Sequence, residues 1–220
     1  YTVSGETYIV TANEGDARDY DGYSEETRVG KMNLCKSLTE AYPKLSSNKQ
    51  LGRLKVSKVG ADVDDDGKVD RLLAYGGRSF SIWSAHGELV FDSADQFEQI
   101  TAQANPALFN IDDDRSDDKG PEPEALALGK IDDRTYAFIG LERTGGILVY
   151  DITEPANATF VHYFSTRQAV ADDDSPEAGD IAPEGIAFVS AQDSANGQPF
   201  IITANEVSGT VSTYAISVRR

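Results

Sequence analysis

The chain has 220 residues, of which 20 are lysine or arginine and 37 are aspartate or glutamate, so its formal net charge is −17 at pH 7. This charge argues against a nucleic-acid partner, which would be repelled at long range, and favours bound cations. Hydrophobic residues make up 40% of the sequence, enough to bury a core, which argues against disorder. No apolar run approaches the roughly 18 residues that span a bilayer.

Short β-rich runs bounded by Gly, Asp and Asn predict a chain that is mostly β-strand. The expected strands, in chain order, are residues 8–11, 54–59, 72–75, 79–83, 88–91, 136–139, 146–150, 200–203 and 210–214. Helical spacing of apolar residues occurs only in two weak stretches, residues 33–42 and 95–103. The sequence therefore predicts an all-β fold.

An internal repeat relates two parts of the chain. Residues 122–128 (EPEALAL) are answered sixty residues later by residues 182–188 (APEGIAF). In each copy a strand follows and ends in an acid, Glu142 or Glu206, and a Gly-containing turn then leads to a strand that finishes on tyrosine. Residues 11–15 (TANEG) echo residues 203–206 (TANE), which indicates a third, partial copy.

A repeated four-strand unit of roughly 40–60 residues is typical of β-propeller blades. We therefore expect residues 1–220 to form a single propeller domain or propeller fragment, with about four blades of four antiparallel strands each. The alternative is a β-sandwich whose hairpins resemble one another by chance. The matching acids at matching places in the unit favour the propeller.

Residues 62–70 (DVDDDGKVD) form the sharpest motif of the chain, with aspartates at loop positions 1, 3, 5 and 9 and glycine at position 6. Ca²⁺ takes six to eight oxygen ligands at about 2.3–2.6 Å, and alternate carboxylates in a tight loop supply them. The candidate ligands are the side chains of Asp62, Asp64, Asp66 and Asp70 and the backbone oxygen of Lys68, whose side chain is expected to point to water. We expect a structural calcium ion here, and the alternative is a solvated acidic turn.

In a propeller, acids from loops far apart in sequence would converge around the axis. These acids are Glu14, Asp16, Asp118, Glu122, Glu124, Glu142, Asp180, Glu184 and Glu206, interleaved with Arg18, Arg115, Lys119 and Arg143. Such a ring can hold further divalent ions together with a phosphate group. Alternatively, the acids cap backbone amides and are neutralised by salt bridges. Because a buried carboxylate without a partner is costly, some partner is expected in either case.

Several longer strings resemble the choice-of-anchor I family. They are residues 14–20 (EGDARDY), 76–83 (GGRSFSIW), 115–124 (RSDDKGPEPE), 179–186 (GDIAPEGI), 204–206 (ANE) and 208–210 (SGT), spread from end to end of the chain. The resemblance implies a secreted, periplasmic or cell-surface bacterial β-propeller protein, of which this chain would be the C-terminal part. It also implies an alkaline phosphatase label, which members of the family often carry. A weaker similarity to phytase-like propellers rests on the Pro-Glu-Gly-Ile string and the acidic loops.

The residue types present restrict what a phosphatase label could mean. The chain has only two histidines, His86 and His162, and no Gly-x-Ser-x-Gly or Walker motif, so neither a histidine-bound zinc site nor a serine nucleophile is supported. Metal-assisted hydrolysis of a small phosphorylated substrate remains. In that hypothesis Asp118, Glu122, Glu184 and Glu206 hold the metal, while Arg18 and Lys119 hold the phosphate. The competing hypothesis is a non-catalytic cell-surface scaffold or binding module, with self-association through exposed edge strands as a further expectation.

Overall fold

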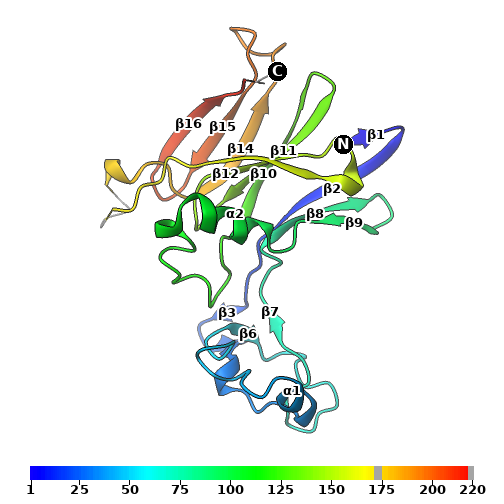
Figure 1. Cartoon of the computed structure of the whole chain (residues 1–220), viewed down its shortest axis with the longest axis vertical. Coiled ribbons are helices and arrows are strands. Elements are labelled where there is room, and N and C mark those ends of the chain that lie inside the picture. The colour runs from blue at the N-terminus through cyan, green and yellow to red at the C-terminus, as the bar shows by residue number, and fades with distance from the viewer. Residues whose placement is uncertain (171–174, 218–220) are drawn as a thin grey trace.

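The computed structural model describes residues 1–170 and 175–217, and its strands form five antiparallel sheets (Figure 1). The described part has two short α-helices, α1 (Lys36–Ala41) and α2 (Gln96–Ala104), and the 3-10 turns η1 (Val29–Lys31), η2 (Pro106–Leu108), η3 (Pro155–Asn157) and η4 (Pro176–Ala178). The expected all-β class is therefore confirmed. No helix in the described ranges is both long and apolar enough to cross a membrane.

Three of the sheets share one plan, in which each strand lies beside the next one along the chain, apart from one insertion. The first sheet contains β1 (Thr2–Val3), β2 (Glu6–Asn13), β8 (Ser79–Ser84) and β9 (Leu89–Asp92). The second contains β10 (Pro123–Ile131), β11 (Arg134–Leu141), β12 (Ile147–Asp151) and β13 (Thr159–Phe164). The third contains β14 (Pro183–Val189), β15 (Phe200–Asn205) and β16 (Thr210–Ala215).

Residues 14–78 form the insertion, which separates β2 from its neighbour β8. Its two small sheets contain β3 (Asp19–Tyr20) with β4 (Tyr23–Ser24), and β5 (Glu26–Arg28) with β6 (Lys55–Ser57) and β7 (Leu73–Ala74). Figure 1 shows the insertion gathered at one end of the molecule, away from the three larger sheets. The aspartate loop of residues 62–70 lies in the insertion, between β6 and β7.

The central strands of the second sheet, β11 and β12, are buried on both faces because the sheet packs between the first and the third. Neighbouring residues of a strand point to opposite faces, so Ile139 of β11 joins Phe80 of β8 in one core, while Phe138 joins Ile201 of β15 in the other. Helix α2 covers the first of these cores with Phe97. Stacking of this kind places the ends of strands from all three sheets near one another.

Two glycines let the third sheet approach the second closely. A Cβ atom at Gly129 would lie 2.5 Å from the ring of Phe188, and one at Gly140 would lie 2.7 Å from the backbone oxygen of Pro183. Neither contact is sterically allowed for a real Cβ atom. Glycine is therefore required at both positions by the packing of β14 on β10 and β11.

The internal repeat has a structural counterpart in the second and third sheets. Glu122 and Ala182, the residues just before β10 and β14, both have positive φ angles, 52° and 59°. Their backbone oxygens accept hydrogen bonds from the amides of Glu142 and Glu206, each at 2.8 Å. Both strand pairs then shift register just after the proline that begins the strand. The matched acids therefore occupy equivalent places.

The described residues contain three sheets of the repeated plan, whereas about four blades were expected. The number is smaller because residues 14–78 form the insertion and not a further blade. The third sheet has three strands in the described part. The sheets do not close into a ring within these residues. A propeller therefore remains a proposal.

Candidate functional site

Six glutamates from the three large sheets gather near the ends of their strands. Glu14, Glu142 and Glu206 directly follow β2, β11 and β15, whereas the others lie at the starts of β10 and β14. Carboxylate oxygens lie within 4.8 Å of one another in two groups, Glu14 with Glu122 and Glu142, and Glu124 with Glu142 and Glu184. Glu206 extends the cluster, because its proximity to Glu184 helps to raise the pKa of that acid. We call these six residues the glutamate cluster.

Glu142 belongs to both groups and is the most perturbed acid of the cluster. Glu142 is only 6% exposed, and this burial raises its pKa to about 7. The nearby acids Glu122, Glu124 and Glu14 also raise the pKa, whereas Arg143 lowers it. Burial, and to a smaller extent the neighbouring glutamates, also raises the pKa of Glu124 and of Glu184. Crowded carboxylates of this kind are relieved by a proton or by a bound cation.

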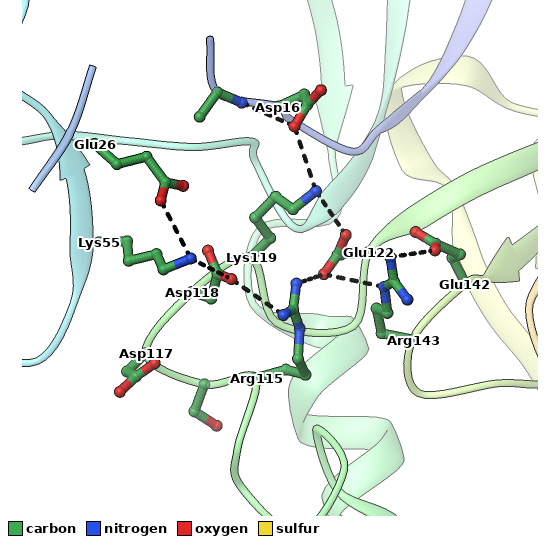
Figure 2. Close-up of polar contacts among 12 residues, drawn as sticks. Asp16, Glu26, Lys55, Arg115, Asp117, Asp118, Lys119, Glu122, Glu142 and Arg143 are labelled. Atoms are coloured by element: carbon green, nitrogen blue, oxygen red, sulfur yellow. Dashed lines mark hydrogen bonds and ion pairs between the residues drawn. The ribbon is translucent and has the colours of Figure 1, made fainter. Parts of the chain in front are cut away.

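Glu122 is fully buried and is neutralised by cations from its own loop and from the next turn (Figure 2). Arg115 donates a hydrogen bond to one carboxylate oxygen, and the Lys119 Nζ lies 2.9 Å from the other. Arg143 Nε lies 3.8 Å away. Burial lowers the pKa of Lys119, but the bonds to Glu122 outweigh it and raise the pKa overall. Lys119 therefore stays charged, and Glu122 is compensated without a metal.

Ion pairs continue from the glutamate cluster into the insertion (Figure 2). Asp118, which is also buried, lies 3.1 Å from Arg115 and 3.2 Å from the Lys55 Nζ of β6. Lys55 in turn lies 3.3 Å from Glu26 of β5. The alternating chain of charges runs through Glu26, Lys55, Asp118, Arg115, Glu122, Arg143 and Glu142. It joins the insertion to the second sheet.

The two cations expected to hold a phosphate are engaged with carboxylates at different places. Arg18 lies in the insertion, where its Nη2 and Nε contact Glu25 at 2.7 and 3.1 Å. Lys119 contacts Glu122, Glu14 at 3.3 Å and Asp16 at 3.7 Å. The structure therefore does not bring Arg18 and Lys119 to one anion.

Asp180 lies apart from the glutamate cluster, although the sequence grouped it with these acids. Its carboxylate accepts hydrogen bonds from Thr210 at 2.7 Å and from Tyr214, both on β16. It caps the third sheet. The ring expected from the sequence thus divides into the glutamate cluster, the ion-paired Asp16 and Asp118, and this separate Asp180.

The aspartate loop brings three of its carboxylates together. Oxygens of Asp62, Asp64 and Asp66 lie within 4.8 Å of one another. Asp62 Oδ2 accepts the Gly67 amide at 2.8 Å, while Asp62 Oδ1 is buried and has no hydrogen-bond donor among the described residues. Gly67, with φ of 82°, makes the reversal that closes the turn. This donor set fits a hard cation.

Two residues of the loop differ from expectation. The Lys68 side chain does not point to water alone, because its Nζ lies 2.6 Å from Asp66 Oδ2, and this hydrogen bond lowers the pKa of Asp66. Asp70 Oδ2 accepts the Val63 amide at 2.8 Å, and Asp70 is not one of the three gathered carboxylates. The Asp66 carboxylate thus contacts the Lys68 ammonium group, and the Asp70 carboxylate accepts a backbone amide.

Sequence reasoning did not single out Lys55 or Glu26, which carry the ion-pair chain into the insertion. Lys55 is 63 residues from its partner Asp118. No local spacing signals a pair of this kind, because the contact depends on how the insertion packs against the loop before β10.

The stacked antiparallel sheets and their acid-rich strand ends define a repetitive β-domain, and comparison with known proteins gives its family. The model of the choice-of-anchor I domain matches residues 1–155, more than half of the chain, so the chain belongs to the choice-of-anchor I family. No solved structure matches significantly.

Comparison with curated proteins finds two relatives of this chain. The chain is 30% identical over 192 residues to Gigasin-3a of Magallana gigas, covering 79% of this chain and 67% of that protein. It is 25% identical over 201 residues to the mesenchyme-specific cell surface glycoprotein of Strongylocentrotus purpuratus, covering 74% of this chain and 26% of that protein. The chain thus spans about a quarter of the length of the second relative.

Proposed function

We propose that this chain is a non-catalytic scaffold or binding module of a secreted, periplasmic or cell-surface protein. The family and the name of the cell surface glycoprotein support this location. The observation that carries the scaffold role is the pairing of the cations around the glutamate cluster. Arg115, Lys119 and Arg143 each contact a carboxylate of the chain itself, so their charge serves cohesion between the insertion and the sheets.

We further propose that the three large sheets are blades of a larger propeller and that residues 1–220 belong to one domain. The shared strand plan, the matching bulges in β10 and β14, and a middle sheet covered on both faces support this architecture. Blades that stack in this way carry equivalent strand ends to one centre. The glutamate cluster lies at such a meeting of strand ends.

The aspartate loop is proposed to bind a structural calcium ion. Asp62, Asp64 and Asp66 would hold it. Support comes from Asp62 Oδ1, which is buried without a hydrogen-bond donor among the described residues and could therefore bind a cation. When bound, calcium supplies the charge that lets three carboxylates lie together. The benefit to the protein is a fixed turn between β6 and β7.

Metal-assisted hydrolysis of a small phosphomonoester is the second candidate function. Its support is that Glu142 joins two carboxylate groups, which offers room for a further divalent ion that would activate water. Of the acids expected to be catalytic, Asp118 and Glu122 are occupied by Lys55, Arg115 and Lys119, which leaves Glu184 and Glu206. The ion pairs therefore favour the scaffold.

Turnover of p-nitrophenyl phosphate by the whole chain, with calcium and after chelation, separates the two functions. The scaffold predicts a rate equal to that of calcium-containing buffer. Calcium-dependent turnover that Glu184→Gln abolishes and Asp66→Asn preserves would overturn the scaffold, because only the first variant alters the glutamate cluster.

A further inference from the structure

A cleft of about 610 Å³ lies between the insertion and the loop that precedes β10. Residues of η1, β5, β6 and the turn before β6 line one side, and Asp114, Arg115, Asp117 and Asp118 line the other. Figure 2 shows Lys55, Arg115, Asp117 and Asp118 side by side along this boundary. The volume is within the range of sites for small molecules, roughly 300–1,000 Å³.

Positive charge is concentrated in this cleft although the chain as a whole is strongly acidic. Five cationic side chains line it, Arg28, Lys31, Arg53, Lys55 and Arg115, against the three carboxylates of Asp114, Asp117 and Asp118. The chain as a whole carries a net charge of −17. At physiological salt, charges beyond about 8 Å are largely screened, so an anion inside the cleft responds mainly to nearby charges. Lys55 and Arg115 are compensated there by Asp118, Glu26 and Glu122, so the excess rests on Arg28, Lys31 and Arg53.

The ion pairs within the cleft leave part of this charge uncompensated. One oxygen of Asp117 serves both Arg28, at 2.9 Å, and Arg53, at 2.7 Å. A single carboxylate therefore balances two guanidinium groups, and the Arg53 side chain is 52% exposed. Lys31 has no ion pair among the described residues and is exposed. These three cations can accept an anionic partner from solvent.

Two glycines keep the backbone at the cleft tightly folded. The Gly30 amide donates to the Gly52 oxygen at 2.9 Å, and the Gly52 amide donates to the Ser47 oxygen at 2.9 Å. A Cβ atom at Gly52 would lie 2.3 Å from the Ser46 oxygen. These bonds hold together the backbone segments that carry Lys31 and Arg53, the residues that follow the two glycines.

We propose that this cleft is a binding site for the sulfate or phosphate ester group of a small sugar. Guanidinium groups match tetrahedral oxyanions through paired N–H donors, and a lysine adds a point charge. Ser46 and Asn48 also line the cleft and are residue types that hydrogen-bond to sugar hydroxyls. Arg115 of the cleft contacts Glu122, but no residue of the aspartate loop or the glutamate cluster lines the cleft, so binding there requires neither calcium nor hydrolysis.

Calorimetric titration of the whole chain with glucose 6-sulfate, glucose 6-phosphate and glucose tests the site. Binding of at least one ester, weakening with added NaCl, is expected, and the stronger ester identifies the natural oxyanion. Neutral glucose is expected to bind far more weakly. Failure of both esters to bind, or equal binding of glucose, would overturn the proposal.

Paired variants locate the binding. Lys31→Gln is expected to weaken it by roughly fivefold, the effect of one partly exposed ion pair, and Asp114→Asn to strengthen it, because an acid is removed from the cleft. Lys130→Gln and Asp133→Asn change the same charges at exposed positions outside the cleft and are expected to have no effect. All four are surface substitutions that leave the fold intact. If the two pairs behave alike, the interaction is general electrostatic attraction and the proposed site is wrong.

Discussion

Lys55 and Asp118 connect the insertion to the body of the molecule: the Lys55 ammonium lies 3.2 Å from the Asp118 carboxylate. The backbone amide of Lys55 also donates to the oxygen of Asp117 at 2.8 Å. Burial lowers the pKa of Lys55, but its bonds to Asp118 and Glu26 outweigh it and raise the pKa overall. A backbone hydrogen bond and an ion pair thus hold the contact together. Asp118 also pairs with Arg115, which in turn contacts Glu122 of the glutamate cluster.

Glu122→Gln is expected to destabilise the protein by about 3–5 kcal/mol. Glu122 has no exposed surface, so its removal leaves Arg115 and Lys119 as partly buried cations without their main counter-ion. Urea unfolding measures the free energy. Glu88→Gln, on an exposed side chain outside the glutamate cluster, is the control and is expected to change stability by about 0.5 kcal/mol or less. Equal effects of the two variants would show that the buried ion pairs contribute little.

Glu142 is expected to make stability fall as pH rises from 4.5 to 7. Its pKa is about 7 in the folded protein because of burial, compared with an ordinary value of 4.5. Between these values the folded state holds a proton that the unfolded state has lost, so raising the pH favours unfolding. Glu142→Gln cannot titrate. It is therefore expected to match the native protein below pH 4.5 and to be more stable by about 3 kcal/mol above pH 7.

Denaturant unfolding across this pH range, in the presence of a chelator, checks the Glu142 prediction. The readout is the difference between variant and native protein, since other acids with lowered pKa values, such as Asp117, shift both curves alike. Glu88→Gln, on an exposed side chain, serves as control and is expected to give a flat difference. A flat difference for Glu142→Gln as well would contradict the raised pKa.

The central strands were predictable from sequence because their side chains alternate around buried apolar positions. β8, β11 and β12 match the expected runs to within two residues at each end. β13 was missed, since this edge strand is largely exposed and its residues carry no in–out pattern. β10 and β14 were recognised as repeats but not as strands, because a bulge after the proline breaks the alternation at their start.

The glutamate cluster was partly predictable because the repeat fixes where each acid falls in its sheet. Equivalent positions such as Glu142 and Glu206 must lie at equivalent strand ends when the sheets stack. The pairing of Lys55 with Asp118 was not predictable, because it depends on how the insertion docks. The position of Asp180 outside the glutamate cluster was also not predictable, because its partner Tyr214 lies 34 residues away on β16.

Gly129→Ala is expected to destabilise the protein by about 1–3 kcal/mol, the usual cost of an overpacked core. The new methyl group would meet the Phe188 ring at 2.5 Å, where β10 of the second sheet faces β14 of the third. Thermal or urea unfolding gives the free energy. In a Phe188→Leu background the penalty is expected to shrink, because the opposing ring is gone. Additive effects of the two substitutions would mean that the sheets do not pack as closely as described.

Calcium is expected to stabilise the chain through the aspartate loop. At a concentration about a hundredfold above its dissociation constant, a ligand that binds only the folded state adds about 2.7 kcal/mol, which corresponds to a rise of roughly 5–10 °C in melting temperature for a domain of this size. Asp64→Asn removes one of three gathered carboxylates and is expected to abolish the rise. Asp133→Asn, an exposed acid outside the loop, is expected to preserve it.

Lys68 offers a second test of calcium binding, because its ammonium group would compete with the ion for the Asp66 carboxylate. The Lys68 Nζ lies 2.6 Å from Asp66, so a bound cation must displace it or share that oxygen. Lys68→Gln is therefore expected to lower the calcium concentration needed for half of the thermal shift. The opposite result, a weaker response, would mean that Lys68 helps to form the site. A melting curve that calcium leaves unchanged in both native protein and Lys68→Gln would leave the loop as a solvated acidic turn.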